Sequence, residues 1–211
     1  MRPKNAGAMN TGQLVVFEGP DGVGKSELAL RFRTWLQEHG FAAELLSFPG
    51  KEEGTLGKLV YDLHLHPERF HLTALTPASL QAMHIAAHLD AIERRIVPSL
   101  KSGRIVVLDR FWWSTFVYGT ASGVDQRLVE QMISTEKVAW GSVRPTILFV
   151  IDRSVPLRQE PSALWVKWRD GYRRLLSIEK TQYTCELIAN EHEIEETLQQ
   201  VLKSWRQVSG N

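Results

Sequence analysis

Cysteine, net charge and long apolar runs are all scarce in this chain. Its 211 residues include one cysteine, Cys185, which excludes an internal disulfide and a cysteine-based zinc site and indicates a reducing compartment. Its 25 Lys and Arg residues nearly balance 24 Asp and Glu residues, so a net charge of +1 gives no extended field for nucleic acid or an anionic membrane. No segment approaches the ~20 apolar residues of a membrane helix, and residues 1–12 lack the apolar stretch of an export signal. These absences predict a cytoplasmic protein that binds small molecules and neither nucleic acid nor membrane.

The chain also lacks internal repeats and low-complexity tracts, and its length suits one α/β domain. We predict a flexible N-terminal tail at residues 1–12 and a single domain at residues 13–211.

Short β-rich segments alternate along the chain with longer helical patterns. The predicted strands are residues 13–18, 43–48, 104–109, 146–152 and 183–189. The predicted helices are residues 25–39, 55–64, 77–100, 125–140 and 161–178, one after Asn190, and one that carries Ser114 and Tyr118. Runs that are apolar throughout, such as residues 147–151, are typical of strands buried on both sides. The pattern predicts an α/β fold with a doubly wound, five-stranded parallel sheet, helices on both faces, and ligands at the carboxyl edge of the strands.

A glycine-rich motif joins the first predicted strand to the first predicted helix. Residues 19–26 read Gly-Pro-Asp-Gly-Val-Gly-Lys-Ser. In such a loop the glycines allow backbone N–H groups to face phosphates, the lysine reaches the β and γ oxygens, and the serine presents a hydroxyl to Mg²⁺. The motif predicts a nucleotide site built from Asp21, Gly22, Val23, Gly24, Lys25 and Ser26.

Phosphate loops at the first strand occur in GTP switches, nucleotide-driven motors and small kinases. The chain has no Asn-Lys-x-Asp motif for reading guanine, which counts against a switch. Two further segments are informative: Phe48-Pro49-Gly50 after the second predicted strand, and Asp109-Arg110-Phe111-Trp112-Trp113-Ser114 after the third.

Together with the loop that begins at Glu18, these segments resemble the thymidylate kinase family. The family pattern has E-G-x-D-G-x-G-K-S/T at the first strand, F-P or E-P-G after the second, and D-R-Y/F-x-x-S after the third. The resemblance extends from about Leu14 to Tyr118, and more weakly from there to the end of the chain.

The resemblance implies a P-loop kinase domain that transfers the γ-phosphoryl group of MgATP to a (deoxy)nucleoside monophosphate, with dTMP to dTDP as the leading reaction. Such transfer depends mostly on alignment and charge neutralisation. It implies that Lys25 steadies the transferred group, that Ser26 and Asp109 hold Mg²⁺, and that Arg110 grips the acceptor phosphate. Relatives are often homodimers, so a homodimer is also expected.

Further residues of the acceptor side follow from the same resemblance. The family uses the position of Asp21 to accept a hydrogen bond from the sugar 3′-hydroxyl, and Phe48 and Tyr118 belong to the segments expected at the acceptor. Lys51 lies where relatives place an arginine, which assigns it to the acceptor phosphate. A solvated loop lysine is the equal alternative.

The catalytic arginine of the family is carried by the phosphate loop in one branch and by a lid after the fourth strand in the other. Gly22 occupies the loop position here, so Arg153 or Arg158 is expected to supply the charge. The stretch that contains them is shorter than the family's lid.

The base-reading positions also depart from the family pattern. Relatives carry an aromatic residue and, four residues later, an arginine, and counting back from Asp109 places His84 and His88 there. Both imidazoles would lie on one helix face. Two histidines that face solvent or fill the core are the equal alternative, and a shift of one residue would substitute Ile85 and Leu89.

Two other functions remain open from the sequence. A deoxynucleoside kinase would use an acceptor without a phosphate, which makes Lys51 superfluous. A nucleotide-binding regulatory module without turnover would account for the short lid and the altered base-reading positions.

Overall fold

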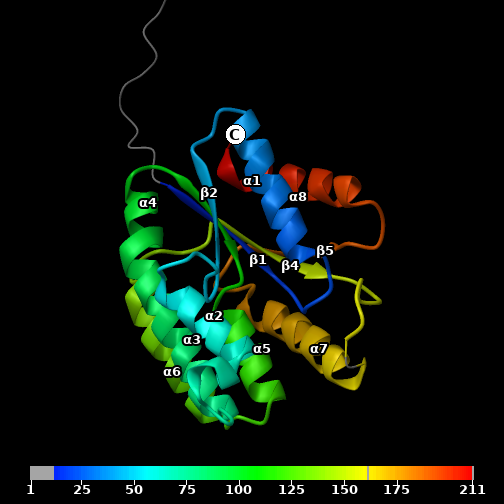
Figure 1. The fold of residues 1–211 in the computed structure, drawn as a ribbon. Helices are drawn as coiled ribbons and strands as arrows, with labels where there is room; N and C mark the ends of the chain where they lie inside the picture. The colour runs from blue at the N-terminus through cyan, green and yellow to red at the C-terminus, as the bar shows by residue number, and fades with distance from the viewer. Residues whose placement is uncertain (1–11, 161, 211) are drawn as a thin grey trace, which may run out of the picture.

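Five parallel strands form the centre of the molecule in the computed structural model, which describes residues 12–160 and 162–210 (Figure 1). The strands lie in the order β2-β3-β1-β4-β5. They are β1 (Gln13–Glu18), β2 (Ala43–Ser47), β3 (Ile105–Asp109), β4 (Ile147–Asp152) and β5 (Cys185–Ala189). This arrangement confirms the predicted α/β class and parallel sheet. The predicted tail lies outside the described residues except for Gly12, whose N–H donates to the Leu100 carbonyl at 3.1 Å.

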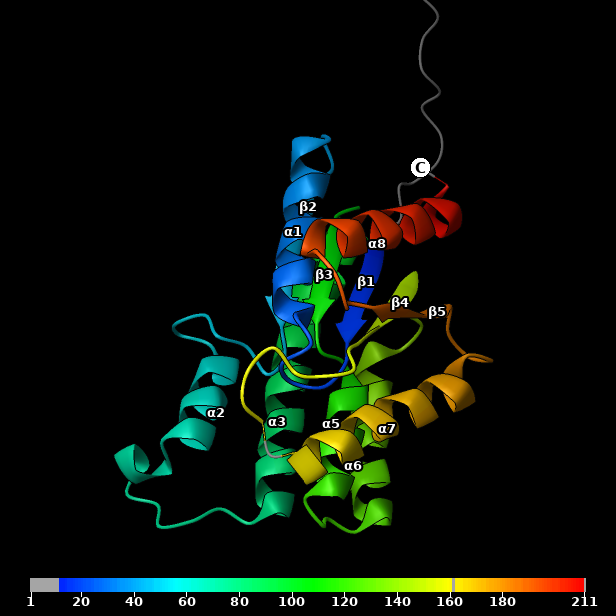
Figure 2. The same ribbon diagram turned by 90° about the vertical axis from the view of Figure 1, so that its right-hand side faces the viewer.

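Helices cover both faces of the sheet, as Figures 1 and 2 show. On one face lie α1 (Lys25–Glu38) and α8 (Ile194–Ser209). The remaining helices are α2 (Leu56–Leu65), a 3₁₀ turn (Pro67–Phe70), α3 (Pro77–Ala91), α4 (Val97–Lys101), α5 (Trp112–Ala121), α6 (Gln126–Trp140) and α7 (Ser162–Glu179). Of these, α5 and α6 pack with α3 on the opposite face, and α7 packs on α5 beside β4 and β5.

The alternation of side chains along β1 divides the core into two layers. Val15 and Phe17 face α1 and α8, whereas Leu14 and Val16 face the opposite layer. All four side chains are at most 1% exposed, and full burial of such a side chain stabilises the fold by about 1.5–3 kcal/mol. Because both layers pack on one strand, β1 is fixed firmly, and so is the loop that follows it.

The prediction of one continuous α-helix at residues 77–100 is wrong at residues 92–96. A π-helical turn at Ile92–Ile96 separates α3 from α4. Pro98, in the first turn of α4, has no N–H to donate to the carbonyl four residues earlier, and its ring would collide with that carbonyl in an α-helix. The wider turn before Pro98 avoids this conflict.

The carboxyl ends of the strands place polar side chains along one edge of the sheet. Glu18 ends β1, Asp109 ends β3 and Asp152 ends β4, and all three are buried. The phosphate loop leaves β1 at the same edge. Among the described helices, none is both long and apolar enough to span a membrane.

Candidate active site

The phosphate loop turns sharply between β1 and α1. Gly24 forms the N-cap of α1 at φ 84°, a left-handed conformation that favours glycine. At Gly19, a Cβ atom would lie 2.3 Å from the Ile151 carbonyl oxygen, so the loop starts in close contact with β4. The N-terminus of α1 thus carries the partial positive charge and free N–H groups that bind phosphate.

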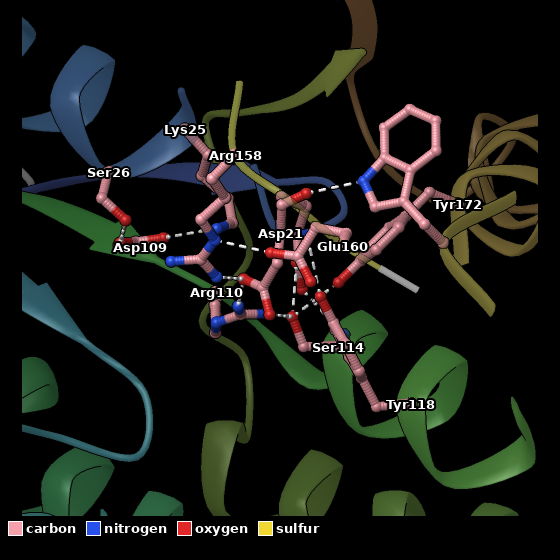
Figure 3. A network of polar contacts seen from close by, with 12 residues as sticks. Asp21, Lys25, Ser26, Asp109, Arg110, Ser114, Tyr118, Arg158, Glu160 and Tyr172 are labelled. Atoms are coloured by element: carbon pink, nitrogen blue, oxygen red, sulfur yellow. Dashed lines mark hydrogen bonds and ion pairs between the residues drawn. The ribbon is translucent and has the colours of Figure 1, made fainter. Parts of the chain in front are cut away.

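Lys25, Ser26 and Asp109 meet at the start of α1 (Figure 3). Lys25 is 4% exposed, and its Nζ lies 3.6 Å from Asp109 Oδ1. The Ser26 hydroxyl donates to Asp109 Oδ2 at 2.5 Å. Burial, reinforced by the charge of Arg110, lowers the pKa of the Lys25 ammonium, although Asp109 and Asp21 oppose this.

The same group of residues fits a magnesium ion. Asp109 Oδ1 is buried and accepts no hydrogen bond from any described residue, and a serine hydroxyl lies beside the carboxylate. Hard oxygen ligands of this kind are those that Mg²⁺ prefers.

Arg110 lies next to this group and joins the phosphate loop to α5. Its guanidinium pairs with Asp21, donates to Ser114 Oγ at 3.1 Å and lies 5.1 Å from the ring centroid of Tyr118. The backbone of Arg110 has φ 78°, which costs a non-glycine residue about 1–3 kcal/mol. The surrounding hydrogen bonds hold the residue in this strained conformation, which is common at functional sites.

Asp21 is surrounded by cations. Burial alone raises the pKa of its carboxyl group, but Arg110, Lys25 and Arg158 outweigh that effect and lower the pKa below its usual value. Arg158 Nη2 lies 3.8 Å from Asp21 Oδ1. The backbone N–H of Asp21 donates to the Tyr118 hydroxyl at 3.0 Å. Asp21 is therefore ionised at neutral pH and organises the arginines around the loop.

Glu18 lies beneath this network and is fully buried. One carboxylate oxygen accepts from the N–H groups of Phe111 at 2.7 Å and Ser114 at 3.0 Å, and the other accepts from Ser114 Oγ at 2.7 Å. Because the N-cap position of α5 is Phe111, which cannot cap a helix with its side chain, Glu18 supplies the missing acceptor. Burial raises the pKa of Glu18 to about 7, although Ser114 and Arg110 act to lower it.

This raised pKa gives a prediction for stability. A carboxyl whose pKa rises from 4.5 to about 7 on folding stabilises the folded state below pH 4.5, and that contribution is lost as pH rises to about 7. We expect the free energy of unfolding of the wild type, relative to Glu18→Gln, to fall by about 3 kcal/mol between pH 4 and pH 8. Urea unfolding at several pH values measures this difference, and parallel curves for the two proteins would contradict it.

The predicted base-side residues lie together around α3 but differ in their surroundings. His88 is 2% exposed, stacks on Phe48 at 4.0 Å between ring centroids, and its Nδ1 lies 2.8 Å from Glu136 Oε2. His84 lies 6.3 Å from His88 between ring centroids. Burial lowers the pKa of His84 to about 3, so its imidazole is neutral, and its Nε2 has no hydrogen-bond partner among the described residues.

Lys51 and the two lid arginines occupy separate places. Lys51 is exposed, and its Nζ lies over the ring of Tyr61 at 5.2 Å from the centroid. Arg153 Nη1 donates to the Asn190 carbonyl, whereas Arg158 reaches Asp21. The lid stretch contacts the phosphate loop directly, because the Leu157 N–H donates to the Gly22 carbonyl at 2.7 Å.

Sequence reasoning missed three residues of this site. Glu18 begins the motif of the phosphate loop, but no role was predicted for it. The signal that could have found it is Phe111, which cannot cap α5 with its side chain, so the N–H groups there need an acceptor from elsewhere. The Trp165 indole donates to the Asp21 carbonyl at 2.7 Å, and Asn190 donates to the Val23 carbonyl at 2.7 Å. Nothing in the sequence around Trp165 or Asn190 indicates these contacts.

The structure brings a triphosphate-binding loop and an arginine suited to a second phosphate into one network, at the carboxyl edge of a parallel sheet. The class of protein that this fold and site define is a P-loop nucleoside monophosphate kinase. A family model described as thymidylate kinase matches residues 17–200. The chain belongs to the thymidylate kinase family.

Individual relatives agree with this assignment. The thymidylate kinase of Synechococcus sp. (strain WH7803) is 29% identical over 181 residues, which cover 78% of this chain and 83% of the relative. The probable thymidylate kinase of Thermococcus kodakarensis is 30% identical over 144 residues, covering 67% and 66%. The crystal structure of thymidylate kinase from Ehrlichia chaffeensis superposes with a TM-score of 0.75 at 25% identity and covers 92% of this chain and 98% of that chain.

Proposed function

We propose that this protein transfers the γ-phosphoryl group of MgATP to dTMP and forms dTDP. The observation that carries the proposal is the network in Figure 3, in which Lys25 pairs with Asp109 and Arg110 pairs with Asp21. If the donor and acceptor phosphates met in this network, one would lie beside Lys25 and the other beside Arg110. The family membership supplies the reaction and the acceptor.

On the donor side, the backbone N–H groups of the phosphate loop and the N-terminus of α1 bind the β- and γ-phosphates. The Lys25 ammonium neutralises charge on the transferred group. Ser26 and Asp109 would hold Mg²⁺, which would neutralise part of the negative charge on the phosphates.

On the acceptor side, the Arg110 guanidinium binds two oxygens of the dTMP phosphate, because its planar fork matches their spacing. Asp21 accepts a hydrogen bond from the sugar 3′-hydroxyl, and Tyr118 supports both residues through its contacts with them. Arg158, which already reaches Asp21, supplies the lid charge. Arg153 holds the start of the lid stretch through Asn190.

The thymine base lies against the side of α3 that carries His84 and His88. Phe48 stacks on His88, and Glu136 fixes the orientation of that ring. The neutral imidazole of His84, whose Nε2 has no partner among the described residues, hydrogen-bonds the base. Lys51 serves as a mobile cation for the incoming nucleotide.

An acceptor screen tests the proposed function. ADP formation is measured with dTMP, thymidine and the other common nucleoside monophosphates at fixed MgATP. We expect dTMP to give the highest kcat/KM and thymidine to give at most background, because thymidine lacks the phosphate that Arg110 binds.

A faster rate with thymidine would make the protein a deoxynucleoside kinase. Tight ATP binding without product from any acceptor would make it a regulatory module. Either result would overturn the proposal.

The proposal extends to the location and the oligomeric state of the enzyme. We place the enzyme in the cytoplasm, where the single Cys185 stays reduced, and we expect it to form a homodimer. Burial raises the pKa of the Cys185 thiol to about 11, so this thiol reacts slowly. Sedimentation equilibrium at micromolar concentration measures the assembly.

A further inference from the structure

Asn190 hydrogen-bonds to three segments, which are the end of β4, the phosphate loop and α8. It lies in the loop between β5 and α8, outside every motif of the sequence. It is 2% exposed. Its backbone N–H donates to the Asp152 carbonyl at 2.8 Å, and its carbonyl accepts from Arg153 at the start of the lid. Its side-chain amide donates through Nδ2 to the Val23 carbonyl at 2.7 Å and accepts through Oδ1 from Thr197 Oγ1 at 2.9 Å.

The chemistry of these partners fixes the orientation of the amide. The Val23 carbonyl can only accept a hydrogen bond, so the group that faces it is the NH₂. The hydroxyl of Thr197 then faces the amide oxygen and donates to it. Because both ends of the amide are paired and the residue is buried, the Asn190 side chain has a single orientation.

The orientation of the Asn190 amide determines the direction of one N–H group of the phosphate loop, that of Gly24. In a trans peptide unit the C=O and N–H groups point in opposite directions. Because Asn190 holds the Val23 carbonyl on the side of α8, the N–H of Gly24 points the other way. That N–H lies in the segment that cradles phosphate, one residue before Lys25.

The close approach of Asn190 also accounts for the glycine at position 24. A Cβ atom there would lie 2.5 Å from Asn190 Nδ2, and the backbone at φ 84° already favours glycine. The contact between Asn190 and the loop is therefore part of the geometry of the loop.

We propose that Asn190 is a positioning residue that fixes the phosphate loop for the triphosphate of the donor nucleotide, with Thr197 orienting its amide. The identity of the ligand rests on the proposed function. In this role Asn190 acts through the Val23–Gly24 peptide unit, whose carbonyl it holds.

The test is Asn190→Asp, which keeps the shape of the side chain and replaces the NH₂ by an oxygen facing the Val23 carbonyl. Calorimetric titration with MgATP alone, without acceptor, is expected to show a Kd weaker by at least about 10-fold, because two acceptors now face each other in a buried position. The Kd for dTMP alone should change by less than about 3-fold. Thr197→Val, which leaves the contact with Val23 in place, should weaken MgATP binding less than Asn190→Asp does.

A stability control separates positioning from general damage to the fold. Leu198→Ala removes a side chain of α8 that is 4% exposed and lies in the core, so it destabilises the protein and leaves the hydrogen-bonding partners of the Asn190 side chain in place. An equal loss of MgATP affinity in Leu198→Ala and Asn190→Asp, each measured well below its unfolding temperature, would overturn the proposal. So would wild-type MgATP affinity in Asn190→Asp.

The result is also distinct from that of the acceptor screen. If wild type does not phosphorylate dTMP but Asn190→Asp still weakens MgATP binding selectively, the proposed function fails and the positioning role stands. If wild type phosphorylates dTMP and Asn190→Asp binds MgATP normally, the reverse holds.

Discussion

Lys25→Ala is expected to lower the kcat of phosphoryl transfer by at least about 10²–10³. Lys25 is the buried cation at the start of α1, and its Nζ lies 3.6 Å from Asp109 Oδ1. Loss of one charge-stabilising donor from such a site costs about 10²–10³ in rate. Steady-state assays of ADP formation with saturating dTMP measure the loss in kcat, and turnover comparable to wild type would refute the assigned role.

Two comparisons exclude a folding explanation for this loss. Because burial lowers the pKa of Lys25, the folded state disfavours its charge, and Lys25→Met should unfold at a temperature no lower than that of wild type. Lys203→Ala, which removes an exposed lysine of α8, should retain the wild-type kcat.

Arg110→Ala is expected to lower kcat/KM for dTMP by at least about 10², because it removes the guanidinium proposed to bind the acceptor phosphate. Arg110→Lys keeps the charge but loses the fork that contacts Asp21 and Ser114, so it should recover only part of the loss. The KM for MgATP should change much less than the KM for dTMP.

Initial rates over a matrix of both substrate concentrations separate these constants. Arg127→Ala, which removes an exposed arginine of α6, serves as the matched control and should behave as wild type. An unchanged KM for dTMP in Arg110→Ala would remove Arg110 from the acceptor site.

The sheet and the phosphate loop could be predicted because their signals are local. Buried strands are continuous apolar runs, and the loop combines glycines, lysine and serine within eight residues between a strand and a helix. The Asp109-Arg110 pair was visible because it directly follows such a run. These features need no knowledge of distant contacts.

Contacts between distant segments could not be predicted in the same way. Val23 and Asn190 are 167 positions apart, and their contact depends on how the loop after β5 passes the phosphate loop. His88 of α3 contacts Glu136 of α6, which is 48 positions away in the sequence. The π-helical turn at Ile92–Ile96 was not predicted, because the only local signal for it is Pro98 and the helical pattern around that proline is long.

The lid arginine also could not be chosen from the sequence. Arg153 and Arg158 were equal candidates for the catalytic charge, and only the three-dimensional path of the chain distinguishes them. Arg153 is held by Asn190, whereas Arg158 extends over the phosphate loop toward Asp21. Their roles in catalysis remain predictions.

The central claim is that a triphosphate and a second phosphate bind end to end between Lys25 and Arg110. Calorimetric titration with one molecule in which adenosine and thymidine are joined 5′ to 5′ through a chain of phosphates tests it most directly. We predict that wild type binds this molecule at least about 100-fold more tightly than ATP or dTMP alone, and that Lys25→Ala and Arg110→Ala each lose most of that gain. Binding no tighter than that of ATP, or full affinity in Arg110→Ala, would contradict the claim.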